Sequence, residues 1–239
     1  QEHGEMKTDR DTYQRVSPIG EQVMTNPPPV HEAAHRRDWP SYFDRMQGKP
    51  PRDTVLKAIE LFGEIDPSNP LHAVDLGCGD GRDSVPLLDA GWTVWAQDGS
   101  EDGIARTKAR PEIQAALENN RIQINHANFE GLQVPKADLV NASFSLPFCP
   151  PDHFQALWTQ IDAAIAPGGR FSGQIFGDRD DWAIIEDRSH FTRDETLKLF
   201  DQYILESFIE EDRPSRQSES MHKHWHMFHI VARKRVTAS

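Results

Sequence analysis

Val74-Asp75-Leu76-Gly77-Cys78-Gly79-Asp80-Gly81-Arg82 has the pattern of a buried strand that runs into a glycine-rich loop, with a helix expected to begin at Asp83 or Ser84. The three glycines let the backbone turn tightly and approach a ligand where a side chain would collide. Asp75, on the strand just before the loop, adds a carboxylate that faces the same place. This combination favours a nucleotide-type cofactor that carries a cationic or amine group.

The composition is that of a globular protein, and the net charge favours a small-molecule substrate. The chain has 239 residues with 37% hydrophobic and 27% charged residues, enough for one domain with a sizeable core. A net charge of −12 argues against a nucleic-acid partner, and no apolar run approaches the ~20 residues of a membrane span. With two cysteines and no signal-peptide pattern at the start, we expect a cytoplasmic protein, either monomeric or homodimeric.

Two segments precede the regular pattern. Residues 1–38 are polar and contain Pro27–Pro29, which predicts an N-terminal arm or tail that is helical in part around 31–37. Residues 39–51 concentrate aromatic side chains and are interpreted either as a clamp packed on the domain or as a lid over a ligand. The range 39–239 is then one domain that begins with this lid-like segment.

From residue 52 onward, apolar periodicity alternates between helix and strand. Alternation of this kind predicts an α/β protein with a Rossmann-like, doubly wound, seven-stranded sheet. Since no helix separates the last two strands, the sheet should be mostly parallel with an antiparallel last strand. Asp152 is expected to cap a helix that Pro167-Gly168-Gly169 ends, and Thr192 to open a capping box. The strands are expected at 71–76, 93–97, 122–124, 139–144, 170–176, 203–211 and 222–233.

Ligands of such sheets bind at the carboxyl ends of the strands, where four loops carry suitable side chains. Asp98, about 20 residues after the glycine loop, is placed to accept hydrogen bonds from both ribose hydroxyls. Asn128 and Phe129 suit the edge and the face of a purine, and Arg52 is a candidate partner for a cofactor carboxylate. The predicted cofactor-binding residues are Arg52, Asp75, Gly77, Cys78, Gly79, Gly81, Asp83, Asp98, Gly99, Ser100, Asn128, Phe129 and Ser143.

On these motifs the chain resembles class I S-adenosylmethionine-dependent methyltransferases over roughly residues 52–235. The match runs from the glycine loop and Asp98 through 137–144 to the turn at 167–169, with Asn128 standing where the family commonly has Asp. The ending 224–234 resembles bacterial methyltransferases of the tellurite-resistance type. The resemblance implies S-adenosylmethionine as the cofactor, S-adenosylhomocysteine as the product and methyl transfer to a small molecule.

Two other functions remain open at this point. One is a nicotinamide-dependent oxidoreductase, although its G-x-G-x-x-G fingerprint differs from the G-x-G-x-G spacing here, and a pyrophosphate would be repelled by Asp75. The other is a module that binds S-adenosylmethionine without catalysis.

Methyl transfer by in-line displacement needs alignment more than a dedicated base, so no catalytic residue is assigned. His222, His224 and His226 alternate along one strand and share a face. That face has three interpretations, namely substrate contact, a metal site or simple exposure to water, and no metal is assigned. The predicted substrate-binding residues are Trp39, Tyr42, Phe43, Phe144, Phe148, Trp182, His190, His222 and His224.

Overall fold

The computed structural model describes residues 30–215 and 223–236, which are built on a seven-stranded sheet in the order β3-β2-β1-β4-β5-β7-β6. β7 is antiparallel to both of its neighbours, and the other neighbouring pairs are parallel. The predicted doubly wound, mostly parallel sheet is therefore confirmed. The strands are β1 (His72–Leu76), β2 (Thr93–Asp98), β3 (Ile122–His126), β4 (Ala137–Ala142), β5 (Ile165–Phe176), β6 (Tyr203–Pro214) and β7 (His224–Lys234).

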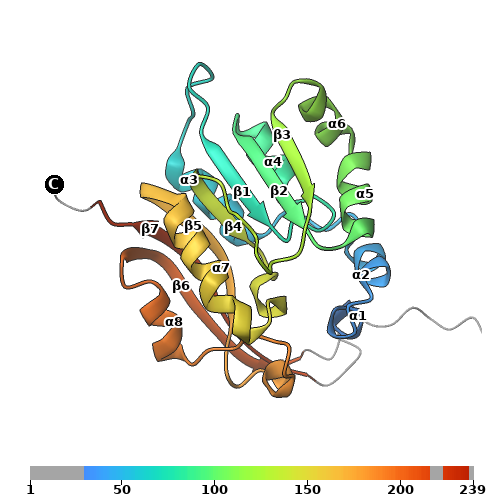
Figure 1. Cartoon of the computed structure of the whole chain (residues 1–239), viewed down its shortest axis with the longest axis vertical. Helices are drawn as coiled ribbons and strands as arrows, with labels where there is room; N and C mark the ends of the chain where they lie inside the picture. Colours follow the sequence, from blue (N-terminus) through green and yellow to red (C-terminus); the bar gives the residue numbers. More distant parts are fainter. Residues whose placement is uncertain (1–29, 216–222, 237–239) are drawn as a thin grey trace, which may run out of the picture.

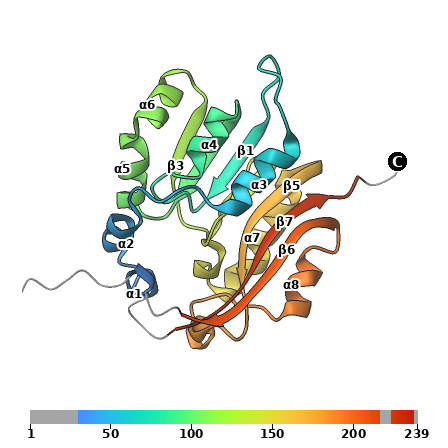
Figure 2. The same ribbon diagram turned by 180° about the vertical axis from the view of Figure 1, so that it is seen from behind.

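Helices cover both faces of this sheet (Figures 1 and 2). α3, α4, α5 and α6 bury their apolar side chains against one face, and α7 packs against the other. The helices are α1 (Val30–His35), α2 (Trp39–Met46), α3 (Asp53–Phe62), α4 (Ser84–Asp89), α5 (Glu101–Ala109), α6 (Pro111–Glu118), α7 (Pro151–Ala164) and α8 (Arg193–Leu199), with short 3-10 helices η1 (Leu146–Phe148) and η2 (Asp181–Ile184).

Both ends of α7 differ from the expectation, and one helix was not predicted from the sequence. α7 begins at Pro151, so Asp152 does not cap it but lies in its first turn, where a carboxylate still favours the helix dipole. α7 ends at Ala164 and β5 begins at Ile165 rather than at 170, since Ile165 already pairs with Ala137 before the register shifts. Pro167-Gly168-Gly169, expected to end the helix, therefore lies within β5. The short helix α6 follows α5 directly, and its first residue is Pro111, a typical first helical position.

The aromatic segment near the N-terminus forms a helix that lies across the sheet's ligand-binding edge. Asp38 caps α2 by accepting from the Ser41 backbone N–H at 3.3 Å. α2 is fastened to α5 by an ion pair of 2.8 Å between Asp44 and Arg106. α1, which precedes α2, overlaps the stretch around 31–37 that was expected to be helical in part. Across 30–215 and 223–236, every helix is too short or too polar to span a bilayer.

Candidate functional site

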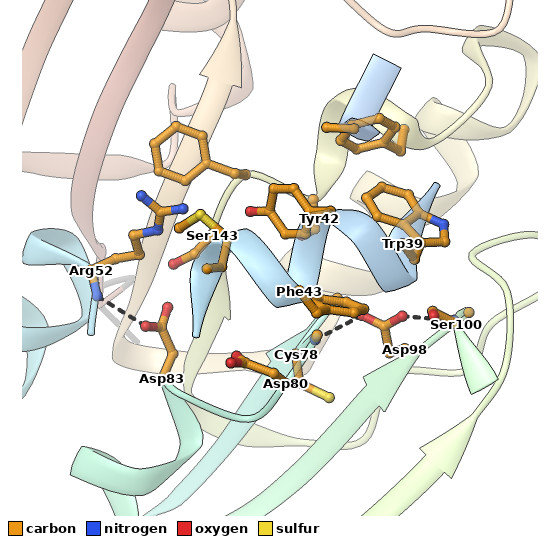
Figure 3. Close-up of a pocket in the computed structure, with 18 of the residues that line it drawn as sticks. Trp39, Tyr42, Phe43, Arg52, Cys78, Asp80, Asp83, Asp98, Ser100 and Ser143 are labelled. Carbon is orange, nitrogen blue, oxygen red and sulfur yellow. Dashed lines mark hydrogen bonds between the residues drawn. The ribbon is translucent and has the colours of Figure 1, made fainter. Parts of the chain in front are cut away.

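A cavity of about 580 Å³ opens at the carboxyl ends of β1, β2 and β4, beneath α2 (Figure 3). This volume is within the range of small-molecule sites. All predicted cofactor residues except Gly81 lie on its wall. They are Arg52, Asp75, Gly77, Cys78, Gly79, Asp83, Asp98, Gly99, Ser100, Asn128, Phe129 and Ser143.

The glycine loop is held against the end of β2 by backbone hydrogen bonds. Gly77 N–H donates to Gln97 Oε1 at 3.2 Å, and Gly79 N–H donates to Asp98 Oδ2 at 2.8 Å. Gly79 has φ +56°, and a Cβ there would stand 2.8 Å from Phe43 Cε1. The position therefore requires glycine, both for its backbone and for the ring of α2 that rests on it.

Asp98 joins the loop to the following helix. Its Oδ1 accepts from the Ser100 backbone N–H at 2.7 Å, while Oδ2 accepts from Gly79. Burial raises the pKa of Asp98 despite these hydrogen bonds. Because each carboxylate oxygen has two acceptor sites, both oxygens keep capacity for donors in the cavity.

Two acidic side chains share a buried network beside the loop. Asp75 is 1% exposed and accepts from Ser84 Oγ at 2.6 Å and from Asn141 Nδ2 at 3.0 Å. The same Asn141 amide lies 3.2 Å from Asp83 Oδ2. Burial, followed by repulsion from Asp83, raises the pKa of Asp75 to about 7. Hydroxyl and amide donors hold this pair, and a cation in the cavity would neutralise it.

A buried cation faces the same cavity. The Arg52 backbone N–H donates to Asp83 Oδ1 at 2.9 Å. The guanidinium of Arg52 lies 4.2 Å from the ring centre of Phe144. Arg52 Nε is buried without a hydrogen-bond partner, and burial lowers the pKa of the group. Acidic and basic groups in one cavity fit the ammonium and carboxylate of an amino-acid moiety.

Aromatic side chains form a large part of the remaining wall. The predicted substrate residues Trp39, Tyr42, Phe43, Phe144, Phe148 and Trp182 all line the cavity. Several other lining residues were not predicted from the sequence. These are Ala34, Arg37, Met46, Asp80, Arg82, Gln97, Glu130, Ser145, Phe176, Glu211, Arg213, Trp225 and Met227.

Three predicted site residues do not line the cavity. Gly81 instead makes room for α5, since a Cβ there would stand 2.9 Å from Thr107 Cγ2. His190 lies behind Phe176, with ring centres 5.9 Å apart, and its Nε2 is 3.8 Å from Asp180 Oδ1. His224 is turned to Asp212 of the neighbouring strand. His222, also predicted, is outside the described residues.

His226 belongs to a cluster whose geometry would suit a metal, together with Glu210 and Asp212. A guanidinium from the same chain bridges these groups. Arg179 Nη2 lies 2.6 Å from Asp212, 3.1 Å from Glu210 and 3.1 Å from His226 Nε2. The cluster is thus a cross-strand ion-pair network in this structure.

Residues 73–169 match the model of a family described as a methyltransferase domain. Over 126 residues the chain is 27% identical to a carboxy-S-adenosyl-L-methionine synthase of Vibrio atlanticus (strain LGP32), covering 50% of each protein. The chain thus spans about half the length of this curated relative.

Solved structures share the fold. TehB from Haemophilus influenzae has a TM-score of 0.65 at 16% identity, covering 82% of this chain and 67% of that one. The Burkholderia thailandensis 1,6-didemethyltoxoflavin-N1-methyltransferase, solved with 1,6-didemethyltoxoflavin and S-adenosylhomocysteine, has a TM-score of 0.57 at 21% identity, covering 92% and 99%. Residues 73–169 are thus similar to a methyltransferase domain, and the chain shares the fold of these solved structures.

Proposed function

We propose that this protein transfers a methyl group from S-adenosylmethionine to a small-molecule acceptor. The observation that carries the proposal is that one cavity combines the buried Asp75–Asp83 pair, the Arg52 cation and the Asp98 carboxylate. The family match and the similarity to a carboxy-S-adenosyl-L-methionine synthase support the same cofactor.

Each end of the cofactor has a chemically matched partner in this proposal. Asp75 and Asp83 receive the ammonium group, and Arg52 receives the carboxylate. Asp98 accepts from the ribose hydroxyls, while Phe129 and the Asn128 amide contact the adenine. The bound sulfonium supplies a methyl carbon that is already activated for displacement. The role of the chain is then to align the acceptor and to exclude water, for which α2 and its aromatic side chains are placed.

The substrate class, the location and the oligomeric state of the protein are also proposed. The net charge of −12 favours a small-molecule substrate over nucleic acid. We propose a cytoplasmic protein that works as a monomer or homodimer, with 39–51, which contains α2, as the lid-like segment of one domain over 39–239.

Thermal unfolding with S-adenosylhomocysteine, with NAD and without ligand tests the cofactor. A ligand at about 100 times its Kd adds roughly 2.7 kcal/mol to the free energy of unfolding. We expect S-adenosylhomocysteine to raise the melting temperature and NAD to leave it unchanged. A shift with NAD alone would support the oxidoreductase instead. If S-adenosylhomocysteine binds but no acceptor is methylated in a broad screen, the non-catalytic module is favoured.

A further inference from the structure

The cavity extends beyond the proposed cofactor wall to side chains of β5, β7 and β6. These three strands lie side by side in the sheet (Figure 2). Phe176 of β5 pairs with Met227 of β7, and Met227 pairs with Glu211 of β6. Residues paired across strands project to the same face of a sheet. These three side chains therefore form a row on the cavity wall that ends in a carboxylate.

Aromatic rings enclose this part of the cavity. Trp39 and Phe148 meet edge to face at 5.0 Å between ring centres, and Trp182 lies 5.7 Å from Trp225. Trp39, Phe148 and Trp225 are only partly buried. Lys223 lies over Trp225, 3.9 Å from its ring centre, and Arg188 lies over Phe148 at 4.8 Å. A planar guest would cover the ring surface that these cations leave exposed, at about 0.5–1.5 kcal/mol per aromatic pair beyond simple burial. We call this part, lined by Trp39, Phe148, Phe176, Trp182 and Trp225, the aromatic chamber.

Glu211 presents a fixed carboxylate to the chamber. Its Oε2 lies 2.7 Å from His229 Nε2, and its Oε1 accepts from Arg213 Nε at 2.8 Å. Burial alone would raise the pKa of Glu211, but hydrogen bonding and charge from His229 and Arg213 outweigh it and lower that pKa. Glu211 is then ionised at neutral pH. Since a carboxylate has about four acceptor sites, it can still accept from a guest.

The amide of Gln174 connects Glu211, through His229, to the wall of the proposed cofactor site. Gln174 Oε1 accepts from the Phe144 backbone N–H at 2.9 Å. Its Nε2 lies 3.4 Å from His229 Nδ1, and His229 Nε2 lies 2.7 Å from Glu211 Oε2. Phe144 has φ +55°, a strained conformation that this hydrogen bond stabilises. Gln174 thus fixes the positions of Phe144 and Glu211 relative to each other.

We propose that Glu211 accepts a hydrogen bond from an N–H or O–H group of the methyl acceptor, and that this acceptor is a planar ring compound held in the aromatic chamber. The inference rests on the proposed function, because it identifies the substrate class of the same cavity. A site built to accept a hydrogen bond discriminates against an analogue that lacks the donor. Glu211 is thereby a specificity-determining residue.

The test compares two probe pairs on protein saturated with S-adenosylhomocysteine. The pairs are 2-naphthol with 2-methoxynaphthalene, and lumazine with 1,3-dimethyllumazine, so each pair differs in the N–H or O–H donor. Ligand-observed NMR gives the Kd of each probe. The readout is the ratio of the two Kd values within a pair, which a purely structural role of Glu211 would leave unchanged.

In the wild type we expect the donor-bearing member of at least one pair to bind about tenfold more tightly. Glu211→Leu should bring that ratio to about one, and Glu211→Gln, which keeps one acceptor oxygen, should give an intermediate ratio. Glu210→Leu is the matched control and should keep the wild-type ratio. Glu210 is the adjacent residue of the same strand but is absent from the cavity wall and pairs with Arg179.

The inference is overturned if the wild-type ratio is about one, if Glu211→Leu keeps the preference, or if no probe binds the loaded protein. Binding of S-adenosylhomocysteine is measured first. If it fails, the proposed function falls together with this inference. If S-adenosylhomocysteine binds but the Kd ratios of the probe pairs differ from those expected, only the proposed role of Glu211 is contradicted.

Discussion

The carboxylates of Asp75 and Asp83 share one hydrogen-bond donor, the side-chain amide of Asn141. Its Nδ2 lies 3.0 Å from Asp75 Oδ1 and 3.2 Å from Asp83 Oδ2. Burial and, after it, repulsion from Asp83 disfavour the ionisation of Asp75, so its proton is retained to a pKa of about 7. A bound ammonium group would reverse this preference. The pair therefore couples ligand binding to proton release.

We predict that the affinity for S-adenosylhomocysteine rises with pH between about 5.5 and 7 and then levels off. Below pH 7 the free protein carries the Asp75 proton and must lose it to pair with the cationic ligand. One released proton corresponds to as much as a tenfold lower Kd per pH unit. Calorimetric titrations in two buffers of different ionisation enthalpy measure both the affinity and the released proton.

Asp75→Asn is the control for this pH dependence. It keeps a side chain that can hydrogen-bond to Ser84 but removes the ionisable group. Its weaker binding should vary little with pH over the same range. An equally steep pH profile in the variant would assign the proton to another group.

Arg52→Met should weaken binding of S-adenosylhomocysteine about tenfold or more, since a charge-assisted hydrogen bond to a carboxylate is worth roughly 1.5–3 kcal/mol. Binding of 5′-methylthioadenosine, which lacks the amino-acid moiety, should hardly change. Arg36→Met, in the turn directly after α1 and absent from the cavity wall, is the control. An equal loss for both ligands in Arg52→Met would mean that Arg52 acts through the shape of the site rather than through the carboxylate.

Gly79→Ala should destabilise the protein by more than Gly48→Ala. Both positions have positive φ, but at Gly48 nothing lies within 4 Å of an added Cβ, whereas at Gly79 the Phe43 ring is 2.8 Å away. Placing a residue with a Cβ at positive φ by itself costs about 1 kcal/mol of the free energy of unfolding. In a Phe43→Ala background the cost of Gly79→Ala should fall toward that of Gly48→Ala, as chemical denaturation would show. An unchanged cost in that background would rule out the collision with Phe43.

Much of the fold follows from local patterns in the sequence. The glycine loop, the apolar alternation and the capping box at Thr192 each have a local physical cause, and the structure places them as expected. The start of β5 at Ile165 depends on pairing with the distant Ala137, which local patterns do not show. α7 begins at Pro151, before Asp152, because proline fits the first helical position.

Some cavity residues are signalled by local sequence patterns, whereas others depend on how distant strands pair. Asp75 and Asp98 are signalled by their spacing from the glycines, and both line the cavity. Glu211 and Met227 lie on strands that reach the cavity through antiparallel register, which sequence alone does not set. Period-two alternation in 203–214 places Glu211 on a face with Arg213, but it does not say which face meets the ligand.

The central claim is that the wall containing Asp98 binds S-adenosylmethionine. Titration of S-adenosylhomocysteine into the wild type and into Asp98→Asn tests it most directly, with thermal unfolding as the check that the variant is folded. We predict one site per chain in the wild type and at least about tenfold weaker binding in Asp98→Asn, because the neutral amide loses charge-assisted hydrogen bonds to the ribose. Equal affinity in the two proteins, or no binding by the folded wild type, would contradict the claim.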